Sequence, residues 1–215
     1  MLVLNLKYTK NGLSTAILMA LMSVVLLAGC ASSPYPQITG DQAEANQNFD
    51  YVIGPGDNLN IFVWGNAELT VDVPVRPDGK ITTRLVEDIE ASGKTPTQLA
   101  RDIEEAYSEY VKNAVVTVIV NGFSGVPAQQ VRVVGEAAAP LSVPFRKHMT
   151  LLDLMIQSGG LTEFADGNAA VLIRSIDGEQ MVYNVRLEDL LKDGDISANM
   201  ALMPGDIMII PEAWF

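Results

Sequence analysis

The sequence predicts an α+β protein with two small domains that follow one another along the chain. Short segments of alternating apolar and polar residues, typical of strands, surround two segments with helical periodicity. One phrase, Pro-Gly-Asp, also occurs twice, each time directly before a strand-like segment. This repetition favours two domains of one class, each with a helix over a sheet. The two copies are Pro55-Gly56-Asp57 and Pro204-Gly205-Asp206.

The chemistry of this phrase indicates a tight turn. Proline presets the φ angle of the first corner, glycine adopts the positive φ of the second, and aspartate accepts hydrogen bonds from nearby backbone. After Asp57, Leu59, Ile61 and Val63 fall on one face of the expected strand. After Asp206 the apolar run of residues 207–210 predicts a second strand. The alternative interpretation is two unrelated turns that share a common tripeptide.

The first domain is expected over residues 49–122, in the order ββαβ. A second strand is expected at residues 71–75, followed by a hairpin turn at Pro77-Asp78-Gly79. Thr95 and Gln98 form a capping box for a helix, with Pro96 at its first position. The β-branched run at residues 114–120 predicts a buried strand. The expected buried face of the helix comprises Leu99, Ile103, Ala106, Tyr107 and Tyr110.

The second domain is expected over residues 128–215. Strands are expected at residues 130–134 and 141–145, with a turn at Gly135 between them. Thr150 and Asp153 cap a helix that stops at Gly159-Gly160. Two further strands, at residues 169–175 and 180–185, are joined by a hairpin turn at Asp177-Gly178. A short helix at residues 187–191 then leads to the second Pro-Gly-Asp turn and the last strand.

The first thirty residues read as an export signal. Lys7 and Lys10 precede an apolar run at residues 13–27, which ends in small residues before Gly29 and Cys30. Residues 1–29 are therefore expected to be a signal peptide. Residues 30–48 are polar, rich in Ser, Pro, Gln and Asn, and are expected to be a flexible tether that reaches on the order of 23 Å. After the signal the longest apolar run has seven residues, too few for a membrane-spanning helix.

Composition excludes several classes of function. The formal net charge is −12, and it becomes −14 without the two lysines of the signal. Nucleic-acid binding, which depends on clustered lysine and arginine, is therefore not expected. The single cysteine leaves no disulfide framework, CxxC pair or cysteine metal site. We expect no cofactor and no metal site.

No catalytic residue is predicted. His148 is the only histidine and stands beside Arg146 and Lys147, so a solvated basic strand end is the expected arrangement. Carboxylate pairs such as Glu104-Glu105 could act as acid and base in a glycosidase. Adjacent helix residues point in different directions, which favours solvated faces, and a non-enzyme is expected.

Cys30 with the preceding Leu-Ala-Gly resembles a bacterial lipobox. The resemblance implies cleavage between Gly29 and Cys30, acylation of Cys30, and a lipid-anchored protein. Because Ala31 rather than aspartate follows the cysteine, the resemblance implies the outer membrane. The alternative is an ordinary signal with an incidental cysteine.

The joint order of these motifs resembles the Wza-type family of outer-membrane polysaccharide export lipoproteins. "YVIGPGDNLNIFVW", "VRPDGKIT" and "TPTQLARDIEEAYSEYV" are similar to its polysaccharide export domain. "VRVVGEAAAPLSVPF", "TLLDLMIQSGGLTEFADGNAAVLIR" and "DGDISANMALMPGDIMIIP" are similar to one β-grasp domain of the SLBB type. At residue 87 the resemblance implies a glycine, but this chain has Glu87. The conformation of the turn there is therefore not predicted.

The resemblance implies an oligomeric ring that conducts a newly made polysaccharide. Implied partners are further copies of the chain, the exported polysaccharide, an inner-membrane chain-length regulator and a separate outer-membrane pore protein. The pore is implied because this chain lacks the C-terminal amphipathic helix of long family members. Trp214 and Phe215 are candidate docking residues for it, or two aromatics that cover their own domain's core. A further hypothesis is that the acidic residues line the lumen of the ring and repel an anionic polymer, so that it does not adhere. The alternative is that the negative charge only keeps the protein soluble. The alternative function is a monomeric lipoprotein that binds a soluble sugar or peptidoglycan fragment.

Overall fold

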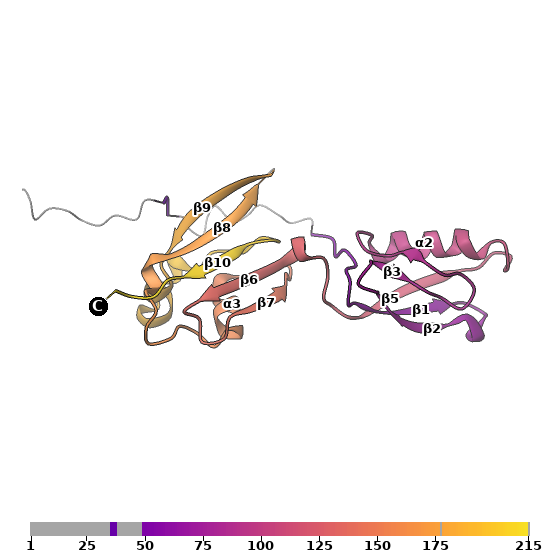
Figure 1. Ribbon diagram of the computed structural model, residues 1–215, viewed down its shortest axis with the longest axis horizontal. Helices are drawn as coiled ribbons and strands as arrows, with labels where there is room; N and C mark the ends of the chain where they lie inside the picture. Colours follow the sequence, from indigo (N-terminus) through magenta and orange to yellow (C-terminus); the bar gives the residue numbers. More distant parts are fainter. Residues whose placement is uncertain (1–34, 38–48, 177, 215) are drawn as a thin grey trace, which may run out of the picture. The chain divides into compact units, whose positions relative to one another are not determined.

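The computed structural model describes residues 35–37, 49–176 and 178–214 (Figure 1). The expected signal and most of the expected tether lie outside these residues. The described residues belong to one compact unit, and their buried apolar side chains gather in two cores. One core is built from residues 53–118 and the other from residues 131–210. Helices and sheets occur together around both cores, which confirms the α+β class.

The first core lies between a three-stranded sheet and a helix. Strand β1 (Asn58–Val63) pairs antiparallel with β2 (Val71–Pro74) on one side and with β5 (Val116–Gly122) on the other. Helix α2 (Pro96–Tyr107) runs along one face of this sheet (Figure 1). The alternation expected in β1 is confirmed, because Leu59, Ile61 and Val63 are buried under the helix.

Helix α2 begins as predicted and ends earlier than predicted. The Thr95 backbone N–H donates to Gln98 Oε1 at 2.8 Å, and the Gln98 N–H donates to Thr95 Oγ1 at 3.3 Å, which confirms the capping box. Leu99, Ile103 and Tyr107 are buried. Tyr110 was expected on this face and is 61% exposed, because the helix stops at Tyr107. Ser108 Oγ donates to the Glu105 carbonyl at 2.6 Å, a local bond that competes with continued helix.

The segment between β2 and α2 differs from the expected hairpin. The turn at Pro77-Asp78-Gly79 forms, closed by the Gly79 N–H bond to the Arg76 carbonyl at 2.9 Å. The strand after it, β3 (Lys80–Ile81), pairs with β4 (Ile89–Glu90) instead of β2. This pairing buries Ile81 completely in the first core. A short 3-10 helix, η2 (Ala67–Leu69), connects β1 to β2.

Strand β5 forms where a buried strand was predicted, and it is buried on one face only. Val116 and Val118 face the core, whereas Val115 is 53% and Ile119 is 47% exposed. The physical reason is that α2 covers a single face of the three-stranded sheet. On the opposite face Phe62 of β1 is 39% exposed, and Trp64, directly after β1, is 71% exposed.

The second core is covered by a mixed five-stranded sheet in the order β7-β6-β10-β8-β9. The last strand, β10 (Ile207–Ile210), pairs parallel with β6 (Gln130–Gly135) and antiparallel with β8 (Ala170–Ile176). The edge strands are β7 (Leu141–Pro144) and β9 (Glu179–Val185). Ile176 pairs with Glu179, so the predicted hairpin between β8 and β9 is confirmed. The second Pro-Gly-Asp turn therefore leads into the middle of the sheet.

Helix α3 (Leu151–Gln157) packs into this second core. Its predicted capping box is confirmed, since the Thr150 N–H donates to Asp153 Oδ2 at 2.8 Å and the Asp153 N–H donates to Thr150 Oγ1 at 3.4 Å. The short helix expected at residues 187–191 is a π-helix, η5 (Asp189–Asp193), ended by Gly194 at φ 72°. Three 3-10 turns complete the fold: η3 (Pro127–Gln129), η4 (Gly167–Ala169) and η6 (Ile196–Ala198). Among the described residues, none of the helices has the length and apolarity needed to cross a bilayer.

Candidate functional site

The two Pro-Gly-Asp phrases form turns of the same geometry. Gly56 has φ 90° and Gly205 has φ 87°, the positive range that glycine adopts without strain. In both turns the aspartate N–H bonds to the carbonyl three residues earlier, at 3.2 Å. In both turns, too, the aspartate carboxylate accepts from the N–H of that same earlier residue. Each turn thus closes on itself and starts a core strand.

The Asp57 carboxylate is completely buried and accepts four hydrogen bonds. Oδ2 accepts from the Gly54 N–H at 2.9 Å and from the Tyr51 hydroxyl at 2.5 Å. Oδ1 accepts from the N–H groups of Ser124 and Gly125 at 2.6 and 2.9 Å. Burial, and the hydrogen bond to Asp57, raise the pKa of Tyr51. Asp57 therefore ties the start of β1 to the segment that follows β5.

The Asp206 carboxylate is equally buried but binds a cation. Arg174 Nε donates to Oδ1 at 2.9 Å and Nη2 donates to Oδ2 at 2.7 Å, a bidentate ion pair in which both side chains are shielded from solvent. Arg174 Nη2 also donates to the Ala201 carbonyl at 3.1 Å. Burial raises the pKa of the Asp206 carboxyl, and the Arg174 guanidinium opposes that effect. The pair fixes β10 against β8.

Sequence reasoning named Asp206 but missed Arg174. The signal was present in the strand itself, because Ala170, Leu172 and Arg174 fall on one face at a period of two. A charged residue on the apolar face of a central strand needs an opposite charge. With both aspartates saturated by internal donors, neither carboxylate is available to a substrate, and the two turns hold strands in place.

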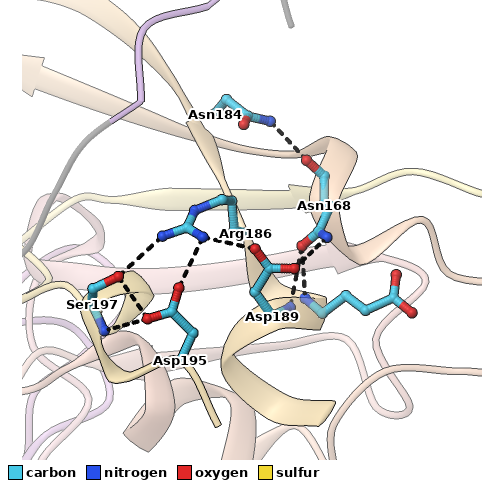
Figure 2. A network of polar contacts seen from close by, with 7 residues as sticks. Asn168, Asn184, Arg186, Asp189, Asp195 and Ser197 are labelled. Atoms are coloured by element: carbon cyan, nitrogen blue, oxygen red, sulfur yellow. Dashed lines mark hydrogen bonds and ion pairs between the residues drawn. The ribbon is translucent and has the colours of Figure 1, made fainter. Parts of the chain in front are cut away.

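A third polar cluster organises the long connection between β9 and β10 (Figure 2). Arg186, just after β9, binds Asp189 at 2.7 Å, Asp195 at 2.9 Å and the Ser197 hydroxyl at 3.1 Å. The Ser197 hydroxyl and backbone N–H, and then Arg186, lower the pKa of Asp195. One guanidinium thus joins η5 to η6.

Two asparagines extend this cluster toward the sheet (Figure 2). Asn168 Nδ2 donates to Asp189 Oδ1 at 2.7 Å, and Asn168 Oδ1 accepts from the Asp189 N–H at 3.3 Å. Asn184, which is buried in β9, donates to the carbonyls of Asn168 and Ala170 at 3.0 and 3.2 Å. The cluster is closed by its own members, which indicates a structural function.

The remaining residues singled out from the sequence do not converge on a reactive site. His148 is exposed, with a positive φ of 65°. Glu104 accepts from the Val116 N–H at 2.8 Å and pairs with Arg101, so it is engaged. Glu87 is exposed, and the positive φ of that turn, 56°, falls on Asp88. Within the described residues there is no group of three or more histidine, cysteine, aspartate or glutamate side chains placed to hold a metal ion.

The predicted anchoring and docking residues lie at the ends of the chain. Gly29, Cys30 and Phe215 lie outside the described residues. Trp214 is fully exposed, so its side chain does not cover the core of its own domain. Its proposed docking function stays a prediction.

Two protein-family models match consecutive parts of the chain. Residues 45–121 match "Polysaccharide biosynthesis/export protein", and residues 129–210 match "SLBB domain". The polysialic acid transport protein KpsD of Escherichia coli is 24% identical over 163 residues, which cover 76% of this chain and 28% of KpsD. The chain thus spans less than a third of the length of that relative. The two domains and this similarity support a role in polysaccharide export. The chain belongs to the polysaccharide export family, with an export domain followed by an SLBB domain.

Proposed function

We propose that this protein is a subunit of an exopolysaccharide or capsule export complex. In the proposal it is a lipoprotein anchored through Cys30 to the outer membrane, on the periplasmic side, and it forms an oligomeric ring that conducts the polysaccharide without catalysing a reaction. The observation that carries the proposal is the tandem match of an export domain and an SLBB domain, in that order. The similarity to a polysialic acid transport protein supports the same class of cargo.

The proposed partners follow from the family. They are further copies of the chain, the exported polysaccharide, an inner-membrane chain-length regulator and a separate outer-membrane pore protein. The exposed Trp214, with Phe215, is proposed as the contact to the pore. These partners are inferred from the family resemblance.

One surface of the export domain supports contact between subunits. The face of the β2-β1-β5 sheet opposite α2 exposes Phe62, Trp64, Val115 and Ile119, and the Phe62 and Trp64 rings lie edge to face with centroids 6.4 Å apart. Apolar surface of this kind marks interaction sites on proteins that are otherwise polar. A ring would bury it between neighbours.

The oligomeric state tests this proposal. The lipid-anchored protein, extracted in mild detergent after cross-linking in cells, is expected to give one closed oligomer by native mass spectrometry. Trp64→Ser removes an exposed aromatic from the sheet face and is expected to reduce that oligomer. Tyr110→Ser, an exposed aromatic beyond α2, is the matched control. A purely monomeric protein would contradict the ring and favour the alternative, a monomeric lipoprotein that binds a soluble sugar or peptidoglycan fragment.

A further inference from the structure

A hollow of about 590 Å³ opens beside the loop that joins β7 to α3. Its walls come from the segment before β1, the segment after β5, the end of β7, this loop and the end of α3. A second hollow, of about 380 Å³, shares Arg146, Lys147 and Gln157 with the first and continues along α3 to Ile156. We call the two hollows together the aromatic-basic cleft. Of the polar clusters described above, only Tyr51, the hydroxyl donor to Asp57, lines either hollow among the described residues.

One wall of the cleft is aromatic and fixed in place. The Phe49 and Phe145 rings meet edge to face with centroids 4.9 Å apart, and the Tyr51 and Phe123 rings do so at 5.4 Å. The Tyr51 hydroxyl is held by Asp57, and Phe123 is 61% exposed. Ring faces attract the weakly positive C–H groups of a sugar ring, because the face of an aromatic ring is its negative region. A rigid aromatic wall is therefore suited to a pyranose.

Two hydrogen bonds of the Gln129 side chain hold the stretch before β1 in place. Gln129 Oε1 accepts from the Val52 N–H at 3.1 Å, and Gln129 Nε2 donates to the Asp50 carbonyl at 3.1 Å. One side chain thus fixes the stretch that carries Phe49 and Tyr51. The cleft is preorganised, which lowers the entropy lost on binding.

The other wall carries two cations, Arg146 and Lys147, that have no carboxylate partner in the part of the chain that the structure describes. Twelve lysines and arginines lie in the described residues, and seven of them form ion pairs with carboxylates. Arg146 and Lys147 are exposed and make no ion pair among these residues. Among the described residues, no aspartate or glutamate lines the larger hollow. The cleft is thus locally positive on a protein of net charge −12.

The loop that presents these cations has a defined conformation. The Met149 N–H bonds to the Arg146 carbonyl at 2.9 Å, which closes a turn, and His148 takes a φ of 65° within it. A non-glycine residue in this region is unfavourable and marks sites that the surrounding structure holds in place. Asp153, which lines the smaller hollow, accepts from the Thr150 N–H and hydroxyl, both at 2.8 Å.

We propose that the aromatic-basic cleft binds a carboxylate-bearing sugar residue, with the ring against the aromatic wall and the carboxylate on Arg146 and Lys147. A neutral sugar would leave two cations unused, whereas a carboxylate accepts charge-assisted hydrogen bonds from both. The inference rests on the proposed function for the source of the ligand, and it names an acidic polysaccharide as the cargo. Acidic surface elsewhere on the chain would repel such a polymer, so contact would concentrate at this cleft.

Calorimetric titration of the full mature protein in detergent at low salt tests this proposal. The probes are oligogalacturonate, oligosialate, the uncharged maltotetraose and inorganic phosphate. We expect both acidic oligosaccharides to bind and maltotetraose to bind about tenfold more weakly or not at all. Arg146→Gln with Lys147→Gln is expected to weaken acidic binding about tenfold or more. Phe123→Ser is expected to weaken it while leaving the salt dependence unchanged.

The matched control is Arg84→Gln with Lys112→Gln, which removes two cations that form no ion pair among the described residues and do not line either hollow. This control should bind like the unaltered protein. Equal binding of maltotetraose, equal weakening by the control, or phosphate that binds as tightly as oligogalacturonate would overturn the proposal. Normal export of polysaccharide by a protein that binds no acidic oligosaccharide would reject the proposed binding site and leave the proposed function standing. Binding at the cleft with export unaffected by loss of the protein would reject the proposed function alone.

Discussion

Replacing Arg174 by methionine should destabilise the second core more than any exposed-charge substitution. Methionine keeps an apolar stem in the sheet but removes the guanidinium. Three hydrogen bonds are lost, at 2.9, 2.7 and 3.1 Å, and Asp206 Oδ1 is left with no donor among the described residues. The stranded carboxylate is fully buried. Removing one partner of a buried ion pair costs about 3–5 kcal/mol.

A second substitution shows whether the stranded charge causes the loss. Asp206→Asn added to Arg174→Met removes the charge and keeps an oxygen that can accept from the Met203 N–H. The double variant is therefore expected to regain at least about 1 kcal/mol relative to the sum of the two single effects. Arg186→Met is the matched control, because Arg186 is partly exposed, and its loss should cost about 1 kcal/mol or less.

Urea unfolding followed by hydrogen exchange measures these free energies strand by strand. The chain has two cores, so a single transition need not describe it, and exchange separates them. The loss should appear in β6, β8 and β10 and leave β1 unchanged. A cost below about 1 kcal/mol for Arg174→Met, or an equal loss in β1, would refute the reasoning that the pair is a desolvated clamp of the second sheet.

Three further predictions concern backbone and titration. Gly54→Ala should destabilise the first core by about 2 kcal/mol or more in urea unfolding, because the added Cβ would lie 2.0 Å from the Gly125 carbonyl oxygen. An unchanged unfolding midpoint would show that the backbone at Gly125 moves to make room for the Cβ. His148→Gly should raise the melting temperature, with a gain of up to about 1 kcal/mol from relief of the positive φ, and a lower melting temperature would contradict the strain. Carbon-detected NMR titration should give Asp195 a pKa below its ordinary 3.8, and Ser197→Ala should raise it more than Arg186→Gln does. Because folding lowers the pKa of Asp195, this residue stabilises the folded state above its unfolded pKa, and the stabilisation is lost as the pH falls. A loss of stability from Asp195 on raising the pH would contradict this prediction.

Local chemistry was readable from the sequence because its partners are near in the chain. The capping boxes at Thr95 and Thr150 join residues three apart, and the alternation of Leu59 and Ile61 needs only a period of two. Each Pro-Gly-Asp turn likewise closes within four residues. These signals predicted helices α2 and α3 and most of the strands. They did not predict β4, the 3-10 turns or the end of α2, where the Ser108 side chain competes with the helix.

Contacts between distant segments were not readable. The Arg174–Asp206 pair exists because Ile207 pairs with Ile173, and no local pattern specifies that register. The pairing of β3 with β4 also depends on distant contacts, because it buries Ile81 among side chains of other segments in the first core. The aromatic-basic cleft joins three stretches that lie apart in the sequence, residues 49–51, residue 123 and residues 143–157, so its isolated residues gave no motif.

The central claim is tested most directly by measuring where the polysaccharide is in cells that lack this protein. Surface-bound, secreted and periplasmic polymer would be quantified in a deletion strain, in the same strain with the chain restored, and in one restored with Cys30→Ser. The proposed function predicts that deletion depletes surface and secreted polymer while polymer accumulates in the periplasm, and that the restored chain reverses both changes. Unchanged amounts of surface and secreted polysaccharide after deletion would contradict it.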